Sequence, residues 1–194
     1  MRSLDEYPGH AVVNLLVLGD RDRATLFAPI ALGAILPDLP MMLFYLYQKT
    51  WVGTPERIIW SDSYYELGWQ MFFDVFNSLP LLALAVLVAY SMKLPRMVAF
   101  LASMMLHATC DLLLHHDDAH RHFFPFSEWR FASPVSYWDP RHYGAIVSLL
   151  EILIVVVGAV WLFRQYPAKA ARGFLALVLA CYGSYIAYVL VVWV

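Results

Sequence analysis

The spacing of His107 and Asp111 is the feature of this sequence that most directly suggests chemistry. The two residues form a His-x-x-x-Asp pattern inside the apolar run MVAFLASMMLHATCDLLL, at residues 97–114. Four residues apart on a helix, the imidazole and the carboxylate project from one face, a single turn from each other. The pattern therefore predicts a pair of ligands for one divalent cation, with a structural ion pair as the alternative.

The segment that follows this run adds further candidate ligands. His115 continues the same helical stripe, and residues 115–122 read HHDDAHRH. Nitrogen and oxygen donors without thiolates suit zinc, with manganese or iron as alternatives, and they argue against a closed structural zinc site. A helix that ends in a solvated polar loop would have the same composition, so both interpretations stay open for residues 115–122.

Three acidic residues interrupt the other apolar runs, at a cost of about 2.5–3.5 kcal/mol each on membrane-insertion scales. Asp38 lies between prolines in LPDLP, where a broken helix can line a cavity or simply bury a hydrogen-bonded carboxylate. Asp74 and Asn77 share a helical face, which favours metal binding, substrate binding or interhelical hydrogen bonds. Glu151 can serve as a base, a ligand or the partner of a loop arginine.

The composition predicts an all-α, polytopic helical membrane protein with five or six transmembrane helices. Of the 194 residues, 61% are hydrophobic and 14% are charged, and the mean hydropathy is +0.61; soluble domains have about 25% charged residues. The net charge of −2 excludes a broad nucleic-acid surface. We predict one membrane domain over residues 1–194, with spans at 24–47, 68–92, 97–114, 143–163 and 173–194 and a short opening segment at 10–19.

The charges of the connecting segments predict an orientation. The short segments carry most of their charge as bases, namely Arg21, Arg23, Lys93, Arg96, Arg164, Lys169 and Arg172. Short loops that are dense in Lys and Arg face the cytoplasm. The longer loops, at about 49–67 and 115–142, are therefore expected on the outer face, which is the periplasmic face of a bacterial inner membrane.

Several short motifs, taken in order, resemble a known family. They are His10, GAILPDLP, NSL at residues 77–79, LHATCDLLL and FFPFSEWRF. In this order they are similar to the predicted membrane-bound metal-dependent hydrolases, also described as LexA-binding, inner-membrane-associated hydrolase-like proteins. The resemblance covers roughly residues 8–135. It implies an integral membrane hydrolase that depends on a metal.

The resemblance also implies roles for individual residues. His10, Asp38, His107 and Asp111 match the family's presumed metal ligands, and the Pro125–Phe131 segment matches its turn. The family's HRGxTHS motif is absent, because WQMFFDVFNSL places Asn77 where its second histidine would fall. Asp74 lies nearby and is a candidate substitute for that lost ligand.

These observations lead to one preferred function and two alternatives. We expect a hydrolase with a divalent metal, zinc by preference, held by His10, Asp38, His107 and Asp111 with Asp74, Asn77 or His115 completing the shell. Glu151 or His115 would transfer the proton, and Arg130 or Arg121 would hold an anionic group of a membrane lipid or small-molecule ester or phosphoester. The alternatives are a non-catalytic metal carrier and a regulatory membrane protein with a degenerate site.

Overall fold

The described part of the chain, residues 7–137 and 139–193 of a computed structural model, is built from helices and loops without strands. The predicted all-α polytopic fold is confirmed, and the predicted domain of residues 1–194 includes positions 1–6, 138 and 194, which lie outside the described residues. The elements, in chain order, are α1 (Tyr7–Leu18), η1 (Arg21–Leu26), α2 (Phe27–Ile35), η2 (Leu36–Asp38), α3 (Leu39–Leu46), η3 (Tyr47–Val52), α4 (Glu56–Ser61), η4 (Ser63–Tyr65), α5 (Leu67–Asn77), α6 (Leu79–Ser91), α7 (Pro95–Leu114), η5 (Pro140–His142), α8 (Gly144–Gln165) and α9 (Lys169–Trp193).

Four helical segments among the described residues are long and apolar enough to cross a membrane. They are Arg21–Val52, Pro95–Leu114, Gly144–Gln165 and Lys169–Tyr188. The pair α5 and α6, bent by 42° at Ser78, gives a fifth if it is counted as one span. The opening helix α1 is apolar but short, so it can complete a crossing only together with other segments.

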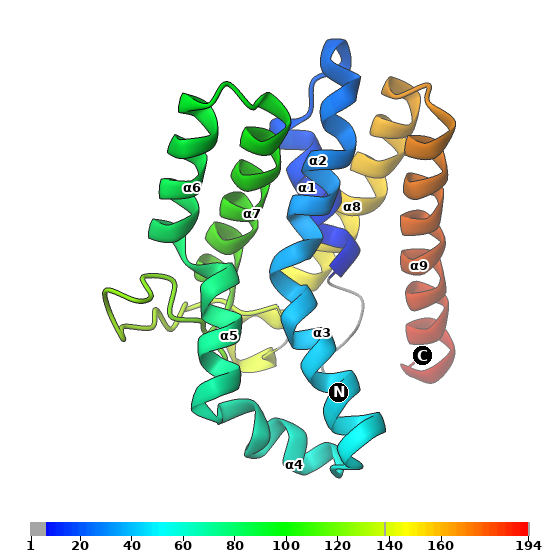
Figure 1. Cartoon of the computed structure of the whole chain (residues 1–194). Coiled ribbons are helices and arrows are strands. Elements are labelled where there is room, and N and C mark those ends of the chain that lie inside the picture. Colours follow the sequence, from blue (N-terminus) through cyan, green and yellow to red (C-terminus); the bar gives the residue numbers. More distant parts are fainter. Residues whose placement is uncertain (1–6, 138, 194) are drawn as a thin grey trace.

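The connections divide between the two ends of the bundle. Figure 1 shows η1, the α6–α7 turn and the α8–α9 turn at the upper end, and α4 with the long segment between α7 and α8 toward the lower end. The Lys and Arg residues of the short connecting segments therefore lie at one end of the bundle, and the two predicted long loops lie toward the other end.

Helices α1, α2 and α7 pack together at the centre of the bundle (Figure 1). Buried polar contacts fix their register: Asn14 donates to both the carbonyl and the hydroxyl oxygen of Ser103 at 2.8 Å, and the Ser103 hydroxyl donates to Ile30 O at 2.6 Å. Hydrogen bonds between helices of this kind hold membrane bundles together where no hydrophobic driving force exists between the helices. This three-helix contact sets the position of His10 on α1 relative to His107 and Asp111 on α7.

A second, aromatic cluster stabilises the lower part of the molecule. Phe44, Ile59, Tyr64 and Phe73 are buried against one another, with Trp60 and Trp69 at the edge. The Phe44 ring meets those of Tyr64 and Phe73 edge to face, at 6.3 and 5.6 Å, whereas the Tyr64 and Phe73 rings are stacked at 5.5 Å. The cluster fixes α5 against α3 and so determines where the polar face of α5 points.

Candidate metal centre

Three separate elements bring the candidate ligands together. His10 lies in the first turns of α1, Asp38 ends the 3-10 turn η2 between α2 and α3, and His107 and Asp111 lie one turn apart on α7. The prolines on either side of Asp38 interrupt the helix at that point, as predicted, without ending it. The carboxylate of Asp38 is thereby turned toward α7.

The donor atoms of His10, His107 and Asp111 lie within 4.8 Å of one another, and all three residues are buried. The Nε2 atoms of His10 and His107 lie 3.3 and 3.0 Å from the two oxygens of Asp111, and Asp38 Oδ1 lies 3.4 Å from His107 Nε2. Ligands bound to one zinc ion at about 2.0–2.2 Å stand roughly 3–4 Å apart. The structure thus brings His10, His107 and Asp111 together as predicted, and it places Asp38 beside His107.

The hydrogen bonding of His107 leaves its second nitrogen free to bind a cation. Its Nδ1 lies 2.7 Å from the carbonyl oxygen of Ala34, which can only accept, so Nδ1 carries the proton and donates. Nε2 then presents a lone pair to the cluster; the oxygens of Asp111 and Asp38 lie 3.0 and 3.4 Å from it, but no contact with a described residue has the geometry of a hydrogen bond. Oδ1 of Asp111 is also buried and makes no hydrogen bond with a described residue. The arrangement matches a metal-ligating histidine oriented by a backbone carbonyl.

His115 extends the cluster by one helical turn. Its Nε2 lies 3.7 Å from Asp111 Oδ1, and its Nδ1 lies 3.0 Å from Asp118 Oδ1. Burial alone would lower the pKa of His115, but the neighbouring carboxylates of Asp118 and Asp111 raise it above its ordinary value. The predicted additional ligand thus lies at the rim of the centre, with Asp118 holding its ring.

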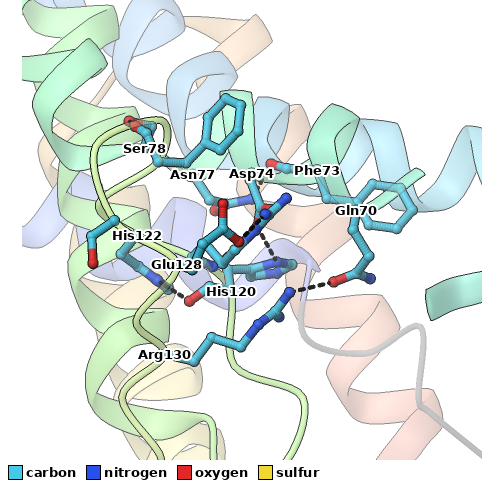
Figure 2. A network of polar contacts seen from close by, with 12 residues as sticks. Gln70, Phe73, Asp74, Asn77, Ser78, His120, His122, Glu128 and Arg130 are labelled. Carbon is cyan, nitrogen blue, oxygen red and sulfur yellow. Dashed lines mark hydrogen bonds and ion pairs between the residues drawn. The ribbon is translucent and has the colours of Figure 1, made fainter. Parts of the chain in front are cut away.

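Asp74 and Asn77 lie in an adjoining network rather than in this trio. Asp74 is fully buried and accepts from the backbone N–H of Arg121 at 3.0 Å and from its Nε at 2.5 Å. Figure 2 shows both residues facing the loop that carries His120, whose Nδ1 lies 3.9 Å from Asp74 Oδ1. Asp74 is therefore the partner of an arginine in this structure, and its carboxylate fixes the loop after α7 against α5.

The remaining predicted residues, Arg130 and Glu151, have partners of other kinds. Arg130 donates to the carbonyl of Ala119 at 2.5 Å and to Oε1 of Gln70 at 2.9 Å (Figure 2). Glu151 accepts a 2.6 Å hydrogen bond from the Tyr182 hydroxyl. In this structure Arg130 links the loop after α7 to α5 through Gln70, and Glu151 links α8 to α9 through Tyr182.

Three further groups support the site, namely the carbonyl of Ala34, the carboxylate of Asp118 and the guanidinium of Arg121. The sequence indicated Asp118 as one of the donors in HHDDAHRH and Arg121 as an alternative to Arg130 for holding an anionic group, but not their contacts with His115 and Asp74. The Ala34 carbonyl was missed, because a backbone carbonyl leaves no signal in a sequence.

No protein-family model, curated protein or solved structure matches this chain.

Proposed function

We propose that the chain is a metal-dependent membrane hydrolase that acts on an ester or phosphoester. The proposal rests on one observation, the buried cluster of His10, His107 and Asp111 with Asp38 beside it. Two imidazoles and a carboxylate are the ligand set of many catalytic zinc sites, which leave a further position for water. A bound zinc ion lowers the pKa of such a water to about 7 and so supplies hydroxide at neutral pH.

The residues of the chain would have distinct tasks in this chemistry. His10 and His107 hold the cation as neutral imidazoles, while Asp38 and Asp111 balance its charge. Asp38 is the most accessible of the four, with 15% of its side chain exposed, and it marks the side from which a substrate can enter. His115, at the rim and held by Asp118, is placed to transfer a proton.

The family resemblance supports the same activity, and the position of the cluster supports a lipid or another membrane-associated substrate. All four ligands lie toward the end of the bundle that carries the long loops. A path for ions or protons would need ionisable groups along the whole depth of the membrane. The one-sided placement therefore favours a hydrolase over the alternative of a transporter.

The test pairs metal content with hydrolysis. The full chain, purified in detergent, is compared with His107→Asn, which keeps a donor for the Ala34 carbonyl and removes Nε2. The probes are a fluorogenic short-chain ester and a fluorogenic phosphodiester in mixed micelles. We expect zinc-dependent hydrolysis of one probe by the wild type and loss of both zinc and activity in His107→Asn. Zinc binding without hydrolysis of a broad ester and phosphoester panel would instead support the non-catalytic alternatives.

We further propose that the protein lies in a bacterial inner membrane with its long loops and the metal centre facing the periplasm. The supporting observation is the concentration of Lys and Arg in the short turns at one end of the bundle. In a variant lacking Cys110 and Cys181, a single cysteine at the exposed position 117 should react with an impermeant reagent added from outside. A cysteine at position 94, in the α6–α7 turn, should not react, and the reverse pattern would invert the orientation.

A further inference from the structure

Next to the metal centre lies a second group of buried polar atoms without hydrogen bonds in the part of the chain that the structure describes, and one of them, Nδ1 of His120, lies 3.9 Å from Asp74 Oδ1. Among the described residues, Nδ1 of His120, Nε2 of His122 and Oδ1 of Asn77 are buried and make no hydrogen bond. The three side chains are 6%, 1% and 2% exposed. Figure 2 shows them on the two sides of the contact between α5 and the loop after α7. An unpaired buried polar atom costs about 1–3 kcal/mol, so three together call for an explanation.

Two of these atoms can be identified as acceptors from their neighbours. Nδ1 of His122 lies 3.2 Å from the carbonyl oxygen of His120, so Nδ1 carries the proton and Nε2 presents its lone pair. Nδ2 of Asn77 donates to the carbonyl of Phe73 at 3.1 Å, which directs Oδ1 the other way. Neither acceptor has a donor within the described chain, and a bound cation would satisfy both.

The electrostatics of the group also favour a cation. Burial lowers the pKa of His120, and burial together with the neighbouring His120 lowers the pKa of His122 to about 4, so both imidazoles are neutral at pH 7. The guanidinium of Arg121, in the same loop, is paired through Nε with Asp74 and through Nη1 with Glu128, while its Nη2 is buried and makes no hydrogen bond with the described residues. The ring centres of His120 and His122 are 5.9 Å apart, and two imidazoles that share a zinc ion have ring centres roughly 5–6 Å apart.

We propose that His120, His122 and Asn77 form a second site for a borderline divalent cation such as zinc. The site is distinct from the cluster of His10, His107 and Asp111. The two are neighbours through His115 and His120, whose ring centres lie 6.3 Å apart. The proposal of a second site does not depend on hydrolysis at the first one, because it is based on ligand atoms of its own that make no hydrogen bonds within the described chain.

The experiment counts zinc ions per chain by elemental analysis after equilibrium dialysis at buffered free zinc. His122→Asn removes Nε2 but keeps a donor for the His120 carbonyl, just as His107→Asn does at the first site. We expect two ions in the wild type, one in each single variant and none in the double variant. His142→Asn is the matched control for zinc bound non-specifically to half-buried histidines, because His142 lies outside both sites, with its ring centre 3.6 Å from that of His116. This variant should bind two ions per chain, like the wild type.

The outcomes separate this proposal from the proposed function. If His122→Asn binds as much zinc as the wild type, or if only His142→Asn loses an ion, the second site is refuted while the first is untouched. If both sites fill and no ester or phosphoester is hydrolysed, the proposed function fails and the second site remains. Each variant is checked for a monodisperse peak in size-exclusion chromatography. Asn77→Leu, similar in volume, tests the same site should His122→Asn fail to fold, and it too should lose one ion.

Discussion

Replacing Gly33 by alanine should weaken both the fold and the metal centre, because α7 packs directly against Gly33 of α2 and leaves no room for a side chain. A Cβ at this position would lie 2.9 Å from Ser103 Cβ and closer still to the carbonyl oxygen of Phe100. Ordinary contacts begin at 3.4 Å, so the two helices must separate by at least 0.5 Å (3.4 minus 2.9). Overpacking of this kind costs about 1–3 kcal/mol.

The same separation should reach His107, because Ala34 follows Gly33 in the chain. The bond from His107 Nδ1 to Ala34 O is 2.7 Å long, and a further 0.5 Å brings it to the upper limit of ordinary N–H···O hydrogen bonds, about 3.2 Å. Loss of a group that orients a metal-ligating histidine typically lowers metal affinity about 10- to 100-fold. We therefore expect Gly33→Ala to bind zinc at least about tenfold more weakly than the wild type.

The assay combines thermal unfolding in detergent with zinc affinity measured by competition against a chromogenic chelator. Gly173→Ala in α9 is the matched control, since a Cβ there meets nothing within 4 Å, and it should leave affinity unchanged and stability equal or slightly higher. If Gly33→Ala keeps wild-type affinity while its melting temperature falls, the α2–α7 contact supports the fold but does not position His107. If neither quantity changes, the argument from close approach is wrong.

Three further predictions concern the polar contacts around the centre. Asn14→Leu should lower the melting temperature in detergent, because Ser103 loses both hydrogen bonds from the Asn14 amide, a loss of about 1–3 kcal/mol; an unchanged melting temperature would show that this contact is dispensable. Asp74→Asn should destabilise the protein by about 3–5 kcal/mol, because it leaves the buried charge of Arg121 underneutralised. This should appear as faster proteolysis within residues 115–137, and wild-type resistance would contradict it. In metal-free protein, the pKa of His122 lowered to about 4 means that the unfolded state binds more protons between pH 6.5 and 4. Stability should therefore fall as pH drops through this window, by up to about 3 kcal/mol, and His122→Asn should flatten that slope in thermal scans; an equal slope in both proteins would exclude His122 as its source.

The spans were predictable because their physical cause is local. The run at 97–114 became α7, which begins two residues earlier because Pro95 fits the first turn of a helix. The last helix begins at Lys169 rather than Gly173, since long basic side chains can keep their charge in water while the helix continues through the interface. Whether the opening segment crosses the membrane could not be predicted from the sequence. A helix of 12 residues is too short to span a bilayer, and this segment is too apolar to be a solvated loop.

The metal centre was predictable in part, for reasons that differ between residues. The pair of His107 and Asp111 follows from helical periodicity alone. Asp38 was also suggested by its place between two prolines, but grouping it and His10 with His107 and Asp111 depended on the order of motifs in a similar family, because about 70 to 100 residues separate them from that pair and no local rule connects them. What brings them together is the packing of α1 and α2 on α7, which the sequence encodes through small and polar residues such as Gly33 and Ser103.

The sequence correctly indicated that the polar face of α5 contacts other polar groups, but it did not indicate which groups these are. Asp74 pairs with Arg121 and Asn77 faces the histidines of the same loop. That loop has no regular secondary structure between His115 and Tyr137, so no periodicity indicates which of its side chains turn inward. The run HHDDAHRH looked like solvated surface or ligand in equal measure, and in the structure His115, Asp118, His120 and His122 are buried while Asp117 is exposed.

The position of Glu151 shows how a residue can matter to the centre without touching the cation. Its carboxylate packs so closely against the backbone of Gly9 that no side chain larger than hydrogen fits there, and the Tyr182 hydroxyl, which donates to this carboxylate, lies against the same position of Gly9. Gly9 precedes His10 in the first turn of α1, where backbone N–H groups lack helical partners and the positive end of the helix dipole favours a negative charge. A carboxylate at this point steadies the turn that carries His10. The charge inside α8, expected from the sequence to move protons, is thus placed to fix the orientation of one ligand relative to the two on α7.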